Sequence, residues 1–421
     1  MASGAGRAAI AVMRLSGPGC RGAVASLCGG VVPSPRHASL RRLRDEAGAV
    51  LDQALVLWLP GPGSYTGEDS AELFLHGGRA VIDGVAMALV ALGLRPAEPG
   101  EFTRRAFLNG RMDLVEAEAV HDLVSAETEA QRRQALRQLD GELGRVYRRW
   151  SDRLRFMLAQ QEALIDFPDE DLPPAVEAEL ATTLDSLRSE ITAHLNDARR
   201  GEKLREGLVF AITGAPNVGK SSLINSLSER DVAIVSPTPG TTRDTLETRV
   251  VLGGVPVTLV DTAGLRETTD AIEAEGVRRA LVRAEDADLV IEVVDTDAVS
   301  APPGDRRVLV ANKSDLGGVA PPDAIRISTL TGEGLDSLRT RLAAAARALT
   351  ESEGPPPLTR TRHRAALIEA LERLNAAAET TLPELRGEDL RLALRSLGRI
   401  TGHVGVEDIL DTLFRQFCIG K

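Results

Sequence analysis

The sequence is poor in aromatic side chains, cysteines and long apolar runs, and each shortage excludes a class of protein. Aromatic residues make up only 3% of the 421 residues, too few for a surface that binds nucleic acid by extensive base stacking. The three cysteines show no CxxC spacing, which predicts a reducing compartment and no zinc site. No apolar run approaches membrane-spanning length, and Arg14 interrupts the first one, which argues against a signal peptide. We therefore expect a soluble, cytoplasmic protein without membrane attachment.

Lysine is also scarce, because arginine supplies nearly all of the positive charge. The 50 basic residues include lysine only at positions 203, 220, 313 and 421. A net charge of −11 argues against a chain that holds nucleic acid by charge alone. Where this chain uses a compact ammonium group, we expect a specific geometric demand. Two of the four lysines, Lys220 and Lys313, lie in the motifs described next.

Residues 214–221 read GAPNVGKS and fit the phosphate-loop pattern G-x-x-x-x-G-K-[ST]. They follow a β-type apolar run over 208–212 and open a helical pattern, which is the strand–loop–helix setting that such a loop requires. Glycines let the backbone curl around phosphates, the helix N-terminus attracts their charge, and Lys220 neutralises it. Ser221 is placed to bind magnesium. For this motif alone, a glycine-rich turn that matches by chance is the alternative.

Three further motifs follow in the order of a GTPase. Residues 239–244 (PGTTRD) offer a threonine to magnesium, and residues 261–264 (DTAG) end a buried strand with an acid that reaches the ion. Residues 312–315 (NKSD) follow another apolar strand. Asp315 can accept from both the N1–H and the 2-amino group of guanine, and an adenine site has no use for that acceptor. The base is therefore predicted to be guanine.

Hydrophobic periodicity predicts a multidomain protein. We expect an α+β domain over residues 1–109, an all-α region over 110–206, an α/β P-loop GTPase domain over 207–344 and a second helical part over 345–421. The GTPase domain would then be inserted into a helical domain. Strands are expected at 9–15, 55–59 and 71–76, a helix at 78–93, and a hairpin across Gly253-Gly254. Taken alone, residues 66–69 and 99–103 are typical of solvated turns and helix caps, and His121 and His194 of helix surfaces.

Several stretches outside the nucleotide motifs carry a family resemblance. They are residues 67–69 (GED), 76–78 (HGG), 99–102 (PGEF), 105–109 (RAFLN), 165–170 (IDFPDE) and the C-terminal 417–421 (FCIGK). Together with the GTTRD of 240–244, they make the chain resemble the MnmE (TrmE) family of tRNA-modification GTPases over nearly its whole length.

The resemblance implies an activity, cofactors and partners. The N-terminal domain would be folate-binding-like and form a homodimer, and the chain would work with the flavin- and NADH-dependent MnmG (GidA) as a heterotetramer. The pair would add a carboxymethylaminomethyl or aminomethyl group to C5 of the wobble uridine of certain tRNAs. A formyl- or methylene-tetrahydrofolate would supply the one-carbon unit, and a potassium-activated hydrolysis of GTP would drive the conformational cycle. The tRNA would be contacted mainly through the complex.

The resemblance also assigns residues. The GTP set is Asn217, Val218, Gly219, Lys220, Ser221, Ser222, Ser236, Thr238, Thr241, Thr242, Asp261, Thr262, Ala263, Gly264, Asn312, Lys313, Asp315 and Ser328. Magnesium is assigned to Ser221 and Thr242, potassium to Asn217, Ser236, Thr238 and Thr241, and folate to Arg14, Glu72, Arg111 and Lys421. On the residues alone, Asn217 is equally an amide that stabilises its loop.

Three residues carry catalytic expectations. Lys220 acts on the phosphates. Leu265 stands where many GTPases place a water-orienting glutamine, so another group must position the water. Glu273 matches the family acid that acts through a water, and an ordinary solvated glutamate at a helix start is the alternative. Cys418 belongs either to the one-carbon chemistry or to the partner interface.

The chain departs from the family pattern in three places. It begins just before the Gly6-Arg7 turn, so we expect the family's first strand to be missing. Ser328-Thr329 stands where Ser-Ala is expected, and Arg111 where lysine is expected. Two rival classes stay open: a ribosome-assembly GTPase, which would carry a basic RNA-binding appendage, and a regulatory switch GTPase without modification chemistry.

Overall fold

The chain folds into two compact units in a computed structural model. The described residues are 1–4, 8–166, 174–230, 247–261, 286–295, 306–351, 355–404, 410, 413–415, 417 and 420. The N-terminal unit comprises Met1–His121, Gly144–Ser151 and Leu397–Lys421, and the second unit comprises Asp122–Leu143 and Asp152–Ser396. Among the described residues, the N-terminal unit has a four-stranded sheet and the second unit a six-stranded sheet.

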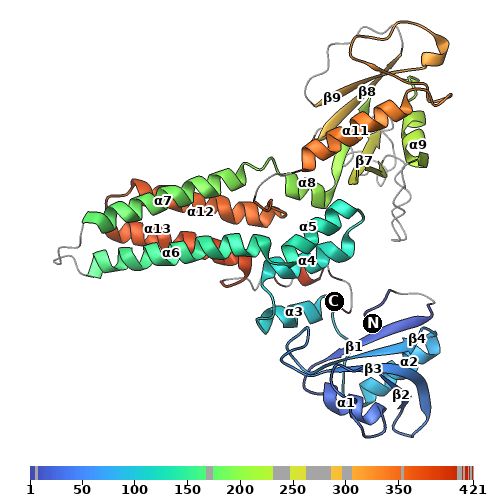
Figure 1. The fold of residues 1–421 in the computed structure, drawn as a ribbon, viewed down its shortest axis with the longest axis vertical. Helices are drawn as coiled ribbons and strands as arrows, with labels where there is room; N and C mark the ends of the chain where they lie inside the picture. The colour runs from blue at the N-terminus through green and yellow to red at the C-terminus, as the bar shows by residue number, and fades with distance from the viewer. Residues whose placement is uncertain are drawn as a thin grey trace, which may run out of the picture. The chain divides into compact units, whose positions relative to one another are not determined.

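An antiparallel sheet forms the centre of the N-terminal unit (Figure 1). Its strand order is β1 (Ile10–Ser16), β4 (Ser70–His76), β3 (Val50–Leu59) and β2 (Ser39–Arg44). Alternate residues of β1, β3 and β4 are buried, as expected of a sheet with one covered face. Helices α1 (Cys20–Leu27) and α2 (Arg79–Ala91) cover that face, and the core between them contains Leu43, Val56, Leu73 and Val24.

The opposite face of this sheet is open and partly apolar. A row of four residues crosses all four strands in register: Leu40 pairs with Leu55, Leu55 with Phe74, and Phe74 with Val12. Leu40 is 55% and Leu55 44% exposed. The next row places Arg14 opposite Glu72. A charged pair thus lies beside an uncovered apolar row on the same face.

Two short helices and the C-terminal part of the chain complete the N-terminal unit. Helix α3 (Glu101–Leu108) begins after Gly100, and α4 (Leu114–Ser125) follows it. The last described residues, Phe414, Phe417 and Gly420, are buried in this unit. Figure 1 marks the N-terminal end of the chain near β1.

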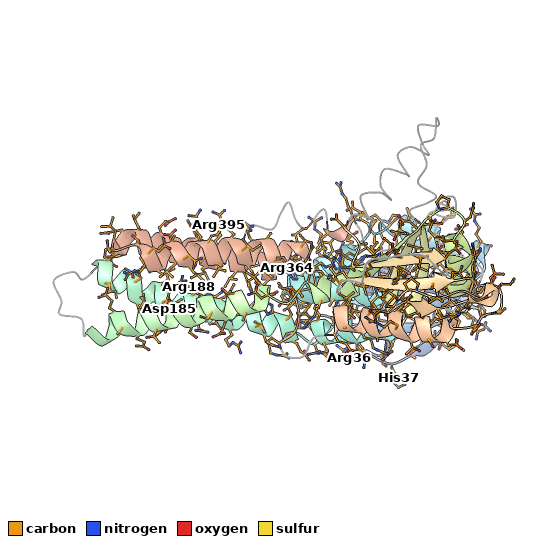
Figure 2. The ribbon with its side chains drawn as sticks, turned by 90° about the horizontal axis from the view of Figure 1, so that it is seen from above. Arg36, His37, Asp185, Arg188, Arg364 and Arg395 are labelled. Carbon is orange, nitrogen blue, oxygen red and sulfur yellow. The ribbon has the colours of Figure 1, made fainter. Side chains whose placement is uncertain are left out.

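Long helices form one part of the second unit (Figure 1). They are α5 (Glu129–Leu139), most of α6 (Glu142–Asp166), α7 (Pro174–Leu195), α12 (Thr361–Glu379) and most of α13 (Pro383–Thr401). Thr128 starts α5 with a reciprocal capping box to Gln131. Helix α12 packs along α7, where Arg188 donates to Asn375 and pairs with Asp185 one turn before it (Figure 2).

A mostly parallel sheet forms the other part of the second unit. Its order is β10 (Ile325–Arg326), β9 (Arg307–Asn312), β8 (Leu289–Asp295), β5 (Leu208–Thr213), β7 (Val255–Asp261) and β6 (Glu247–Leu252). Only the β6–β7 pair is antiparallel in this sheet as described, and it turns at Gly253-Gly254. The described helices around it include α8 (Arg200–Glu206), α9 (Lys220–Arg230) and α11 (Leu335–Thr350). The α+β N-terminal unit, together with the helical part and the α/β part of the second unit, confirms the predicted multidomain class.

Two expectations for single elements were wrong or incomplete. Strand β2 was not predicted, because its sequence SLRRLR is polar and places only Leu43 in the core. His194 was expected on a helix surface, but it is 7% exposed, and this burial lowers the pKa of its imidazole. The predicted domain boundaries stay a prediction. Among the described helices, none is both long and apolar enough to cross a membrane.

Candidate functional site

The phosphate loop joins the central strand β5 to helix α9 in the second unit. Two of its glycines are set by close neighbours as well as by positive φ angles of 141° and 98°. A Cβ on Gly214 would lie 2.1 Å from the Val293 carbonyl oxygen, and one on Gly219 would lie 2.2 Å from Asn312 Nδ2. Only glycine therefore fits at these positions, and the loop backbone stays free to surround a phosphate chain.

Lys220 begins helix α9 and points back over the loop. Its Nζ donates to the carbonyl oxygens of Gly214 (2.9 Å) and Ala215 (2.7 Å), and the residue is only 5% exposed. The ammonium group is thus held above the concave side of the loop, and phosphate oxygens are stronger acceptors than these carbonyls. Asn217 takes a left-handed conformation at the exposed tip of the loop, and Ser222 is exposed in the first turn of α9.

A hydroxyl and a carboxylate meet at the magnesium site expected from the sequence. Ser221 Oγ donates to Asp261 Oδ2 over 3.0 Å, from the first turn of α9 to the end of β7. Asp261 is 7% exposed. Hard oxygen ligands of this kind fit Mg²⁺, which is normally held by one or two protein oxygens together with substrate phosphates. Thr242, the second expected ligand, lies outside the described residues.

The NKSD motif begins at the last residue of β9 and continues into the turn that follows it. Asn312 is 1% exposed, and its Nδ2 donates to the Val218 carbonyl over 2.8 Å, which ties the motif to the phosphate loop. Ser328 Oγ donates to Asp315 Oδ1 over 2.5 Å. Lys313 pairs with Asp295 at 3.0 Å. These contacts join Asn312 to Val218 and Asp315 to Ser328, and the guanine site that these residues would form stays a prediction.

The remaining predicted residues of the nucleotide site stay predictions. Those that lie outside the described part of the chain are Ser236, Thr238, Thr241, Thr242, Thr262, Ala263, Gly264 and Glu273. Cys418 and Lys421 of the C-terminal tail lie outside it as well.

A second cluster lies on the open face of the N-terminal sheet. The Arg14 guanidinium donates through Nε (3.0 Å) and Nη2 (2.8 Å) to Glu72 Oε1, and through Nη1 to the Gly420 carbonyl oxygen (3.3 Å). It stands 5.5 Å from the ring centre of Tyr65 and 5.7 Å from that of Phe102. Two of the four expected folate residues therefore meet, and two aromatic rings that were not predicted flank them.

Arg111, the third expected folate residue, is exposed, and its side chain lies against Gly67. A Cβ on Gly67 would lie 3.3 Å from both Cγ and Cδ of Arg111, so the stem of this arginine covers Gly67. The structure shows no direct contact of Arg111 with Arg14 or Glu72 among the residues it describes.

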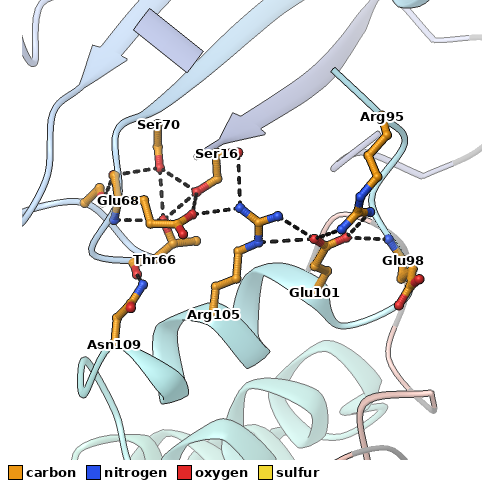
Figure 3. A network of polar contacts seen from close by, with 10 residues as sticks. Ser16, Thr66, Glu68, Ser70, Arg95, Glu98, Glu101, Arg105 and Asn109 are labelled. Carbon is orange, nitrogen blue, oxygen red and sulfur yellow. Dashed lines mark hydrogen bonds and ion pairs between the residues drawn. The ribbon is translucent and has the colours of Figure 1, made fainter. Parts of the chain in front are cut away.

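An extended polar network supports this loop (Figure 3). Arg105 of α3 pairs with Glu68 (2.9 Å) and Glu101 (2.6 Å), and Glu101 also pairs with Arg95 (2.6 Å). Ser16 donates to Glu68 over 2.9 Å. Burial opposes ionisation of Glu101, but hydrogen bonds from Arg95, the Glu98 backbone and Arg105 prevail and lower its pKa from 4.5 to about 2.

The sequence signal for this network was present but was given another interpretation. The GED and PGEF motifs carried the family resemblance, yet alone they were expected to be solvated turns and caps. The structure instead links them, since the guanidinium of Arg105 reaches both acids. The spacing of Glu101 and Arg105, four residues apart on one helix, was the local sign of an ion pair.

Two family models match the chain. Residues 114–418 match the model described as the MnmE helical domain, and residues 1–111 match the model described as the GTP-binding protein TrmE N-terminus. Together they span nearly all of the sequence.

Curated relatives match along the whole chain. A protein of Gluconacetobacter diazotrophicus called tRNA modification GTPase MnmE is 65% identical over 426 residues, covering 100% of this chain and 98% of its own length. A protein of the same name from Granulibacter bethesdensis is 59% identical over 433 residues, with the same coverage. Among solved structures, the G domain of the T. maritima FeoB iron transporter is 26% identical and covers 33% of this chain and 98% of its own. Its TM-score is 0.21, which carries no weight for the fold.

Proposed function

The chain belongs to the MnmE family of tRNA modification GTPases, and we propose that it hydrolyses GTP to drive the modification of wobble uridine in certain tRNAs. The observation that carries the proposal is the joining of two sites in one chain. A phosphate loop with a guanine-type motif lies in the second unit, and a charged, aromatic-flanked cluster lies on the open sheet of the N-terminal unit. A GTPase that acts only as a switch needs the first site alone.

In the nucleotide site, this chain's residues bind the guanine base, neutralise the phosphates and orient the magnesium ligand. Asp315, oriented by Ser328, accepts from guanine, and Asn312 fixes the NKSD loop against Val218. Lys220 exchanges its loop carbonyls for phosphate oxygens when the nucleotide enters. Ser221, with Thr242 as the expected second ligand, would hold Mg²⁺, which supplies charge neutralisation at the β- and γ-phosphates. Asp261 accepts from Ser221 and orients its hydroxyl.

Water activation requires a group other than the one used by many GTPases. Leu265 has no polar atom to orient water, so we assign this task to Glu273. We further propose that K⁺ is held by Asn217 with Ser236, Thr238 and Thr241, where it supplies the positive charge that an arginine finger brings in other GTPases. The exposed position of Asn217 on the phosphate loop supports this assignment.

In the N-terminal unit, we propose a site for a formyl- or methylene-tetrahydrofolate. The carboxylates of a folate suit the guanidinium groups of Arg14 and Arg111 and the ammonium of Lys421, while its pterin donors suit Glu72. The rings of Tyr65 and Phe102 beside Arg14 fit a flat ring system. Homodimerisation through this domain would cover the apolar row of Leu40, Leu55, Phe74 and Val12.

The chain would act with the flavin- and NADH-dependent MnmG as a heterotetramer in the cytoplasm. The one-carbon unit of the folate becomes part of the aminomethyl or carboxymethylaminomethyl group on C5 of the uridine. Contacts to tRNA would be made mainly by the complex, because this chain is acidic overall.

The deciding experiment is analysis of tRNA from cells that lack this chain. We expect the C5 group of the wobble uridine to disappear and to return when the chain is restored. A ribosome-assembly GTPase would instead leave tRNA unchanged and alter ribosomal subunits. A regulatory switch GTPase would bind no folate, so titration of the purified chain with 5-formyl-tetrahydrofolate separates that alternative.

A further inference from the structure

The C-terminal segment contacts the N-terminal unit at three positions spaced three residues apart. The backbone of Phe414 approaches Gly100 so closely that a Cβ on Gly100 would lie 2.6 Å from the Phe414 carbonyl oxygen. The Phe417 ring lies 5.0 Å from the ring of His121 and 5.3 Å from that of Phe414. Both phenylalanines are at most 5% exposed. The third position, Gly420, is held differently, by backbone and by a single arginine.

Gly420 occupies a space that admits no side chain. It is buried, and its φ of 97° is a conformation that strains any other residue. A Cβ at this position would lie 2.0 Å from the Met1 carbonyl oxygen and 2.7 Å from Ala2 Cα. Met1 and Ala2 cannot yield easily, because the Ala2 amide donates to the Val12 carbonyl of β1 over 2.8 Å.

Arg14 completes the enclosure of Gly420 from the sheet. Its Nη1 donates to the Gly420 carbonyl oxygen over 3.3 Å, while Nε and Nη2 are engaged by Glu72. Tyr65 and Phe102 flank the guanidinium, and its side chain is 22% exposed. The fork of an arginine can serve the carboxylate on one side and the carbonyl on the other at once, which the point charge of a lysine does not reproduce.

We propose that Arg14 and Gly420 form a latch that fixes the C-terminal segment on the open face of the N-terminal sheet. Arg14 is then a positioning residue, because its guanidinium acts on the reaction through the chain segment that it holds. Its effect on tRNA modification rests on the proposed function, whereas the latch itself does not. The family resemblance assigns Arg14 to folate, and this inference gives the arginine a further partner in the chain itself, beside Glu72.

The alternative is that Arg14 serves folate binding and that its contact with Gly420 has no consequence. The two roles differ in what a change at Gly420 does, since that residue offers folate no side chain. Under the latch, Gly420→Ala frees the C-terminal segment and lowers the rate of modification at saturating folate. Under the alternative, Gly420→Ala lowers the rate of modification only by weakening folate binding, so the rate at saturating folate stays normal.

Hydrogen–deuterium exchange of the full chain measures the latch directly. We expect the amides of residues 413–421 to exchange about tenfold faster in Gly420→Ala and in Arg14→Lys than in the parent chain. Gly93→Ala is the matched control, because Gly93 has a similar φ of 85° but nothing within 4 Å of a Cβ. Arg21→Lys, an exposed arginine of α1, is the control for Arg14→Lys. Unchanged exchange in both test variants would overturn the latch.

The positioning role is tested in the same variants with the partner MnmG and tRNA. We expect Gly420→Ala to lower the modification rate at saturating folate about tenfold or more, with folate affinity within about threefold and single-turnover GTP hydrolysis unchanged. A loss of folate affinity that accounts for the whole rate effect would mean that Gly420 acts only through folate binding, and it would overturn the positioning role of Arg14. Normal modification despite faster exchange would overturn it too. If the parent chain supports no modification, the proposed function fails while the exchange result still decides the latch.

Discussion

The hydroxyl of Ser328 donates to Asp315 over 2.5 Å, although the two residues lie 13 positions apart in the chain. Asp315 belongs to a short 3-10 turn, Ser314–Leu316, and Ser328 follows the edge strand β10. The hydrogen bond orients the carboxylate and leaves acceptor sites on both of its oxygens for a base, and Ser328 is fully buried behind it. The guanine specificity inferred from NKSD therefore has a geometric support that the motif alone does not contain.

Exchange of Asp315 for asparagine should change the base preference. We expect Asp315→Asn to weaken GTP binding about 100-fold, because the amide has no charge and only one acceptor oxygen, and to improve binding of xanthosine triphosphate, whose 2-oxo group needs a donor. Equilibrium titration with fluorescent analogues of both nucleotides measures this change. Asp323→Asn, an exposed change two residues before β10, is the control. Normal GTP affinity in Asp315→Asn would mean that the base pocket lies elsewhere.

The sequence was sufficient for the elements whose chemistry is local. The phosphate loop needs its glycines, Lys220 and Ser221 within one strand–loop–helix unit, so spacing alone located it. The β6–β7 hairpin followed from two glycines between apolar runs. Each of these two features is encoded within a short stretch of sequence, which is why periodicity and turn chemistry predict it.

Contacts between distant segments could not be predicted in the same way. Arg14 and Gly420 are 406 residues apart, and no local pattern indicates that they meet. Arg105 links Glu101, four residues away, with Glu68, 37 residues away, and only the first pairing has a helical signal. Strand β2 pairs with β3 although its own sequence is polar, because its neighbour supplies the hydrogen bonds. Tertiary packing decided each of these cases.

Removal of the Ser221 hydroxyl should impair hydrolysis more than nucleotide binding. Of the two expected magnesium ligands, Ser221 and Thr242, only Ser221 lies in the described part of the chain, and its hydroxyl donates to Asp261. We expect Ser221→Ala to lower the rate of GTP hydrolysis about 100-fold and to raise the Mg²⁺ concentration needed for half of the maximal rate. Ser226→Ala is the control, since Ser226 is half-buried on the same helix and, among the described residues, its hydroxyl bonds only to the Ser222 carbonyl one turn earlier. An unchanged magnesium dependence in Ser221→Ala would remove Ser221 from the metal site.

Hydrolysis should depend on which monovalent cation is present. If Asn217 contributes to a potassium site, GTP hydrolysis should be about tenfold faster or more in KCl than in NaCl at matched ionic strength. Asn217→Ala should abolish this difference, while Asn225→Ala, an exposed asparagine of α9, should keep it. Steady-state phosphate release measures the three proteins in both salts. Equal rates in the two salts for the parent chain would disprove the potassium site.

Glu273 is expected to act in the chemical step only. We expect Glu273→Ala to bind GTP with normal affinity and to hydrolyse it about 100-fold more slowly, because a group that positions water contributes this much in general acid–base catalysis. Single-turnover hydrolysis separates the chemical step from product release. Glu229→Ala, which changes a glutamate of α9 well before Glu273 in the sequence, is the control. If single-turnover hydrolysis is unaffected in Glu273→Ala, the water must be positioned by another residue.

The network around Glu101 should make the stability of the N-terminal unit depend on pH. The folded-state pKa of Glu101 is lowered from 4.5 to about 2, so its ionised form stabilises the fold at pH values above 4.5, and this contribution is lost as the pH falls from about 4.5 toward 2. Glu101→Gln should therefore be less stable than the parent chain by about 2 kcal/mol near pH 7, and the difference should shrink over that window.

Urea unfolding followed by tryptophan fluorescence reports on this unit, because Trp58 and Trp150 both lie in it and are the chain's two tryptophans. Glu46→Gln, an exposed change in the same unit, should leave the pH profile unaltered. A constant difference between Glu101→Gln and the parent chain from pH 7 to pH 3 would show that Arg95 and Arg105 do not hold Glu101 ionised.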